Sequence, residues 1–333
     1  MARMIVPQFW AEAQDQCQRR GRKITVRRFG WSETSTDEAE AMARIRVAEA
    51  IEALKEGNKI NRREPKVAYN GAQGVPIREE VVARFGASVI TRNSYGALCL
   101  NSPDVLFADI DFDEPVAMPL AVATAIFFWI LAVLGAINKN SPLAWVLTAI
   151  PTIIVVIAIN YFVKSIRKKI RIACAGGIES FYRQKISKFL ASHEDWSVRL
   201  YRTPAGFRLL ATNRPFSPND ADVTAFFEAI GADPLYRRMC LNQSCFRARL
   251  TAKPWRIGIS QHMRPRPGVW PVNPEKLPLR TAWISEYDQK AAAYAACRFV
   301  QNLGSSRIDP AVAEVVTLHD RLSRALENGL PIG

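Results

Sequence analysis

The sequence predicts an α+β protein in which a cytoplasmic antiparallel-sheet domain is interrupted by a transmembrane α-helical hairpin. Short runs of alternating or β-branched residues, separated by turn signals, predict antiparallel strands in both flanks. Capped segments with apolar stripes predict the helices that cover these strands. Two long uncharged segments in the middle of the chain predict membrane spans.

The two uncharged segments are Val116–Ile137 and Leu143–Val163, with 22 and 21 residues. A helix rises about 1.5 Å per residue, so each segment is long enough for a hydrocarbon core of roughly 30 Å. The short polar turn between them allows only an antiparallel hairpin, residues 116–163. The alternative is a helical hairpin buried in a large core, but such helices are usually shorter and less uniformly apolar.

A basic run follows the second segment and predicts the orientation of the hairpin. Its cations are Lys164, Arg167, Lys168, Lys169 and Arg171. Because cytoplasmic loops of membrane proteins are enriched in Lys and Arg, we expect both termini in the cytoplasm. These cations are expected at the membrane surface, where anionic headgroups attract them.

The formal charge of +14 is divided unevenly between the flanks. Residues 1–115 hold 17 basic and 17 acidic side chains, whereas residues 164–333 hold 27 and 14, a net charge of +13. We expect the two flanks to pack together as one α+β unit, because both lie on the same side of the predicted hairpin. The basic flank suits a phosphate-bearing ligand, a lipid surface or an acidic protein partner.

The N-terminal flank is expected to contain one helix and a series of short strands. Ser35 begins a capping-box pattern that opens a helix over Ala39–Glu56, which Gly57 ends. The predicted strands are Lys23–Arg28, Lys66–Tyr69, Arg78–Phe85, Ser88–Asn93, Gly96–Leu100 and Val105–Phe112.

The C-terminal flank is expected to alternate helices with strands. The predicted strands are Trp196–Thr203, Phe207–Thr212 and Phe246–Leu250. The predicted helices are Ile178–Ser192, Ala221–Ile230, a short one from Asp233 to Met239, Thr281–Leu303 and Ala311–Glu327. Residues 261–280 contain five prolines and are expected to form an extended loop.

Asp109 and Asp111 are the most specific chemical signal in the chain. Successive side chains of a strand alternate between faces, so the two carboxylates point the same way. Two carboxylates this close need a counter-ion or a proton, and together they suit a divalent cation such as Mg²⁺ or Mn²⁺. The alternative is a solvated acidic end of the strand.

The strand Phe107–Asp111 and the turn Tyr201–Arg208 (YRTPAGFR) together resemble the catalytic domain of archaeo-eukaryotic primases and primase-polymerases. The resemblance implies an RRM-like core that binds a nucleotide. It also implies that Asp109 and Asp111 hold the metal for nucleotidyl or phosphoryl transfer. The histidine that this family carries after the turn is absent, because Phe207, Arg208 and Leu209 stand there, and no third acidic motif is evident.

A group of cations around the strand Phe246–Leu250 is the candidate phosphate or anion surface. Its members are Arg208, Arg247, Arg249, Lys253 and Arg256. The alternative is a solvated face of an antiparallel sheet. The dipeptide His319-Asp320 is expected on the surface.

The remaining signals exclude several function classes. The six cysteines are scattered, and Cys240 and Cys245 lack a second pair with zinc-ligand spacing, so structural thiols are expected. No haem, flavin or zinc is expected, and standard NTPase, dinucleotide-binding, hydrolase and zinc-protease motifs are missing.

The sequence thus predicts a membrane-anchored protein with a divergent or degenerate primase-like domain that binds nucleotide or nucleic acid at a divalent-metal site. The alternative is a non-enzymatic membrane adaptor that binds anionic lipid or an acidic protein. The pattern leaves open whether any reaction is catalysed.

Overall fold

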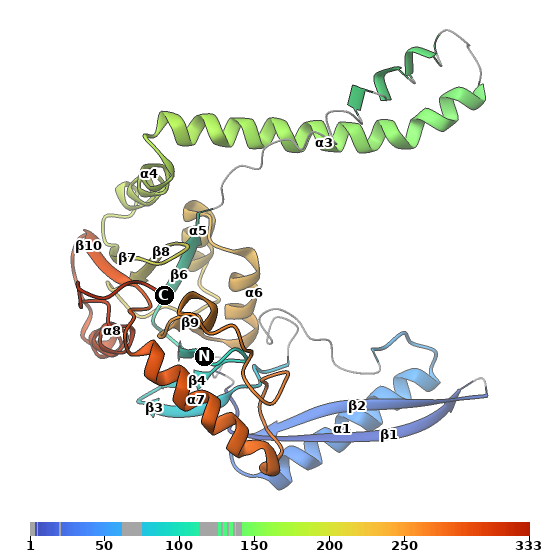
Figure 1. Ribbon diagram of the computed structural model, residues 1–333, viewed down its shortest axis with the longest axis vertical. Helices are drawn as coiled ribbons and strands as arrows, with labels where there is room; N and C mark the ends of the chain where they lie inside the picture. Colours follow the sequence, from blue (N-terminus) through green and yellow to red (C-terminus); the bar gives the residue numbers. More distant parts are fainter. Residues whose placement is uncertain are drawn as a thin grey trace. The chain divides into compact units, whose positions relative to one another are not determined.

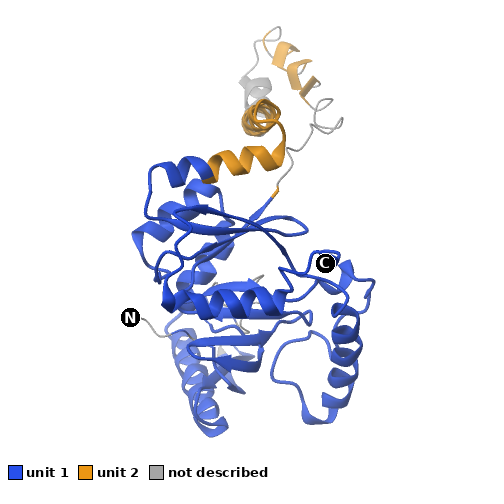
Figure 2. Cartoon of the chain, turned by 90° about the vertical axis from the view of Figure 1, so that its left-hand side faces the viewer, with its two compact units in different colours: residues 1–111, 187–333 blue, residues 112–186 orange. Residues whose placement is uncertain are grey.

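The computed structural model describes Met4 and residues 6–19, 21–61, 75–112 and 142–333, together with 126, 127, 129–131, 133–135 and 137. The chain divides into two compact units, one formed by residues 1–111 with 187–333 and the other by residues 112–186 (Figure 2). The described part is a mixed α+β fold with antiparallel sheets, which confirms the predicted fold class at this level.

The strands form one two-stranded and two four-stranded sheets (Figure 1). Their bounds are β1 Phe9–Arg19, β2 Arg22–Ser32, β3 Glu80–Phe85, β4 Ser88–Arg92, β5 Leu98–Ser102, β6 Phe107–Asp111, β7 Ser197–Arg202, β8 Gly206–Ala211, β9 Phe246–Arg249 and β10 Arg298–Gly304. The helices are α1 Thr36–Lys55, α3 Pro142–Cys174, α4 Ile178–Ala191, α5 Ala221–Ile230, α6 Pro234–Gln243, α7 Leu277–Ala291 and α8 Pro310–Ser323, with short 3₁₀ turns at η1 Pro254–Arg256 and η2 Pro274–Lys276.

The long hairpin β1–β2 packs against α1. Val26 of β2 is fully buried beneath Val47, Ile51 and Leu54, the apolar stripe of the helix. Ser35 caps α1 by accepting a hydrogen bond from the backbone amide of Glu38, as the sequence predicts. Strand β1 was not predicted from the sequence, because its run of Gln, Glu and Asp has low strand propensity and its pairing with β2 decides its conformation.

The two four-stranded sheets have the orders β3-β4-β5-β9 and β10-β7-β8-β6, with every pair antiparallel. They meet where β6 and β9 lie side by side. The Tyr236 hydroxyl from α6 bridges them, donating to Phe107 O of β6 or Arg247 O of β9, each 3.0 Å away. This junction positions the end of β6 beside β9.

Several predicted elements differ from the observed ones. The prediction of one helix over Thr281–Leu303 is wrong in its second half, because α7 ends at Ala291 and β10 pairs with β7 at the edge of the sheet. Strand pairing there outweighs the helical pattern of the local sequence. The predicted strand Lys66–Tyr69 lies outside the described residues.

Within the part of the chain that the structure describes, no helix has both the length and the apolar character needed to cross a membrane. This finding corrects the prediction of a two-span hairpin. The first predicted span lies largely outside the described residues, and the second belongs to α3, which continues without interruption through the basic run. The charges therefore fall inside the same helix as the apolar residues that precede them.

The assignments that depended on the hairpin are corrected with it. The cations predicted at the membrane surface lie on the C-terminal part of α3: Lys164, Arg167, Lys168, Lys169 and Arg171. The cytoplasmic location of both termini was inferred from the same charges and loses its basis as well.

Candidate functional site

A cleft of about 430 Å³ opens at the junction of the two four-stranded sheets. Its walls come from β6, β8 and β9, from the turn after β4, from the β7–β8 turn and from the segment through η1. The lining includes every residue predicted from the sequence as a metal or anion ligand, namely Asp109, Asp111, Arg208, Arg247, Arg249, Lys253 and Arg256. The fold thus brings together two sets of residues that are more than ninety positions apart in the sequence.

Arg208 is engaged within the protein and lies at the base of the cleft. It stands opposite Asp109 in the β6–β8 ladder, and its Nε and Nη2 donate to the two oxygens of that carboxylate over 2.7 and 2.9 Å. Its Nη1 donates to Arg249 O over 2.7 Å, which ties β8 to β9. Since the Arg208 side chain is only 2% exposed, its role is to hold the two sheets together.

Arg247 is also engaged in a buried ion pair. Its Nη2 donates to Glu79 Oε2 over 2.6 Å and its Nη1 to Asn101 Oδ1 over 2.9 Å. Thr91 donates to the same Glu79 oxygen over 2.7 Å. The ion pair is nearly closed to solvent, and the structure places Arg247 in the wall of the cleft as a structural cation.

Arg249, Lys253 and Arg256 form the cationic face of the cleft. Burial lowers the pKa of Lys253, and the charges of Arg249 and Arg256 lower it further. Burial and the neighbouring Arg249 charge likewise lower the pKa of Arg256. Among the described residues, Lys253 and Arg256 form no ion pair within 4 Å. The charges of Asp109 and Asp111 offset part of this lowering for Lys253, and that of Asp111 does so for Arg256, but the pKa of both cations stays lowered. An anion would stabilise the three cations in this partly desolvated site.

Two aromatic side chains lie beside these cations. Tyr95 lines the cleft, and burial raises its pKa to about 12, so it is neutral at physiological pH. Trp255, between Lys253 and Arg256 in the sequence, packs against the edge of Tyr95 at 5.3 Å between ring centroids and is 57% exposed. Neither ring was assigned a role from the sequence, although a Trp between two cations is a signal for stacking on a ligand.

The two aspartates are arranged differently from the predicted metal site. Arg208 occupies both oxygens of Asp109, and its charge outweighs the effect of burial and lowers the pKa of that carboxyl. Among the described residues, no three His, Cys, Asp or Glu side chains are grouped so that they could hold a metal ion. This finding contradicts the prediction of metal binding in the part of the chain that the structure describes, where the Arg208 guanidinium supplies the counter-charge for Asp109.

A buried polar network continues from Arg208 to α8. Nη1 of Arg208 lies 3.4 Å from His319 Nε2, and His319 Nδ1 lies 3.1 Å from Asp320 Oδ1. Asp320 also accepts hydrogen bonds from the Tyr201 hydroxyl and from Arg199 Nη2, both at 2.6 Å. The expectation that His319-Asp320 lies on the surface is wrong, because this pair forms the polar interior between α8 and the sheet.

We expect Asp320 to make stability sensitive to acid. Burial alone would raise the pKa of this carboxyl, but the hydrogen bonds from His319 and Tyr201 and the charge of Arg199 outweigh it and lower the pKa. Its stabilising contribution is therefore present above the ordinary value of 3.8 and is lost as the pH falls through the lower folded-state value. Urea unfolding of the wild type and of Asp320→Asn should show a stability difference that shrinks below about pH 4. A stability difference that stays constant as the pH falls below about 4 would contradict a stabilising role for the Asp320 charge.

Comparisons with protein-family models, with curated proteins and with solved structures find no match to this chain. The resemblance to primases and primase-polymerases is corrected on this ground, since no family model supports it.

Proposed function

We propose that the cleft binds a nucleotide through its phosphates. The observation that carries this proposal is the gathering of Arg249, Lys253 and Arg256 on one face, with lowered pKa values for Lys253 and Arg256. Arg and Lys donors in a partly desolvated cleft suit phosphate oxygens, which accept charge-assisted hydrogen bonds. Arg208 and Arg247 support these residues through their hydrogen bonds to the strands.

Trp255 and Tyr95 favour a nucleotide over a simple inorganic anion. An exposed indole beside the phosphate-binding cations gives a base a flat surface on which to stack. Asp109 and Asp111 line the same cleft and disfavour an anion that fills all of it. A ligand with one charged end and one aromatic end fits a cleft that has cations and an exposed aromatic ring side by side.

We propose that β6, β7 and β8 form the centre of an RRM-like core, because they lie in the order β7-β8-β6 and α5 and α6 follow β8 in the chain. RRM sheets bind nucleic-acid bases on one face. In this chain the cleft is at the β6 end of the sheet, where β9 lies alongside.

Calorimetric titration of adenosine triphosphate into the wild type and into Lys253→Gln/Arg256→Gln tests the proposal. We expect the variant to weaken binding by tenfold or more, because each charge-assisted hydrogen bond contributes about 1.5–3 kcal/mol. The matched control is Arg84→Gln/Arg238→Gln, which removes two exposed cations that do not line the cleft. Equal affinity in the wild type and the cleft variant, or no binding by the wild type, would refute the proposal.

An acidic protein partner is the second candidate function. The excess of positive charge in residues 164–333 favours it. It predicts that an acidic polypeptide such as polyglutamate competes with the nucleotide for the wild-type cleft. Loss of nucleotide binding at equimolar polyglutamate would favour this candidate.

A further inference from the structure

A second basic pocket lies in the proline-rich loop that precedes α7. It encloses about 350 Å³ and is lined by Gln261, His262, Arg264, Pro265, Arg266 and Leu279. The lining contains two arginines and no carboxylate. Arg264 and Arg266 are exposed and form no ion pair within 4 Å with any carboxylate that the structure describes.

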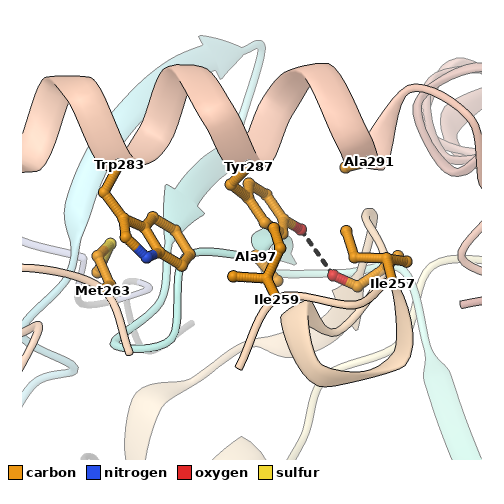
Figure 3. Close-up of a cluster of buried hydrophobic side chains, with 8 residues drawn as sticks. Ala97, Ile257, Ile259, Met263, Trp283, Tyr287 and Ala291 are labelled. Carbon is orange, nitrogen blue, oxygen red and sulfur yellow. Dashed lines mark hydrogen bonds between the residues drawn. The ribbon is translucent and has the colours of Figure 1, made fainter. Parts of the chain in front are cut away.

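The loop is fixed in place by contacts at both ends. Met263 is 1% exposed and inserts into the hydrophobic cluster that Trp283 and Tyr287 of α7 form with Ala97 (Figure 3). Trp283 Nε1 donates to Gln261 O over 3.2 Å, and Arg280, paired with Glu80, donates to Gly268 O over 3.4 Å. The arginines at 264 and 266 therefore project from an anchored backbone, which lowers the entropy cost of ligand binding.

The same anchoring connects the loop to the cleft. Gly268 has φ +79°, and a Cβ there would overlap the carbonyl oxygen of Ser94, so the loop backbone contacts the turn after β4 directly. Ser94 and Tyr95 of this turn line the cleft, and Tyr95 packs against the cluster that holds Met263. One turn thus borders the cleft and supports the second basic pocket.

We infer that the pocket at Arg264 and Arg266 is a second phosphate-binding site, and that the ligand of this protein is single-stranded nucleic acid. The inference rests on the proposed function of the cleft and extends it. A mononucleotide bound at Arg249, Lys253 and Arg256 has no further phosphates for the loop arginines. A single strand presents phosphates at regular intervals and a base to Trp255, so it uses both cationic groups and the ring beside Lys253.

Fluorescence anisotropy with a labelled 20-residue oligothymidylate, together with calorimetry with adenosine triphosphate, tests the inference. The variant Arg264→Gln/Arg266→Gln should weaken binding of the oligonucleotide by about tenfold while triphosphate binding changes less than about twofold. Each single-strand phosphate contact contributes about 0.7 to the dependence of log affinity on log salt, so the slope should fall by about 1.4. Arg84→Gln/Arg238→Gln again serves as the control of equal charge.

The outcomes separate the two proposals. If the loop variant binds the oligonucleotide with wild-type affinity and salt dependence while Lys253→Gln/Arg256→Gln weakens it, the second site is refuted and the cleft stands. If the cleft variant binds both adenosine triphosphate and the oligonucleotide with wild-type affinity, the proposed function fails. Polyglutamate that binds as tightly as the oligonucleotide, with the same loss in the loop variant, would overturn the assignment to nucleic acid.

Discussion

Replacing Arg247 by methionine is expected to lower the free energy of unfolding by about 3–5 kcal/mol, as measured by urea denaturation. The side chains of Arg247 and Glu79 are 9% and 7% exposed, and Arg247 Nη2 lies 2.6 Å from Glu79 Oε2. Removing the guanidinium leaves the Glu79 carboxylate buried, with the Thr91 hydroxyl as its remaining donor among the described residues. A buried charge without its partner loses hydration that nothing replaces.

The double variant Arg247→Met/Glu79→Gln is the control for this prediction. A neutral amide at position 79 still accepts the hydrogen bond from Thr91 and carries no charge that needs a partner. We expect the double variant to recover a large part of the lost stability, with a coupling energy of about 1–3 kcal/mol. If the loss of stability in the double variant equals the sum of the losses in the two single variants, Arg247 and Glu79 are not coupled.

Replacing Arg208 by methionine is expected to cost about 3 kcal/mol, at the lower end of the range for a broken buried ion pair. The cost is lower because the Asp109 side chain is 41% exposed and can be hydrated when its partner is removed. The variant also removes the hydrogen bond to Arg249 O, so the contact between β8 and β9 should weaken. Urea unfolding followed by circular dichroism measures the loss.

Asp109→Asn separates the roles proposed for Arg208. The amide keeps the shape of the side chain and one acceptor, but it leaves the buried Arg208 guanidinium without its counter-charge, so a loss of about 3 kcal/mol is expected while nucleotide affinity is kept. If Arg208 instead bound the ligand, as the sequence analysis predicted, Arg208→Met would lose nucleotide affinity and keep its stability. That result would contradict the structural role assigned here.

The residues of the cleft could be predicted from the sequence better than their roles could. Alternation along the strands correctly indicated that Asp109 and Asp111 share a face and that Arg247 and Arg249 do as well. Strand alternation carries no information about which strands are neighbours, so the pairing of Asp109 with Arg208 across β6 and β8 could not be foreseen. For the same reason, two of the five predicted anion ligands are structural cations.

The elements that sequence reasoning missed depend on contacts between distant segments. β1 and β10 have weak local strand signals and form because β2 and β7 offer partners. His319 and Asp320 read as surface residues because a polar dipeptide near the end of an amphipathic helix is usually solvated. Tyr201 and Arg199 on β7 supply the buried partners that make an interior position favourable.

The most direct test of nucleotide binding in the cleft is photoaffinity labelling with 8-azidoadenosine triphosphate, followed by peptide mapping by mass spectrometry. The account predicts a labelled peptide that contains Trp255 or Tyr95, and labelling that unmodified adenosine triphosphate suppresses. It also predicts that Lys253→Gln/Arg256→Gln loses this adduct. Labelling confined to other segments, or labelling that competitor does not reduce, would contradict the claim that the cleft is a nucleotide-binding site.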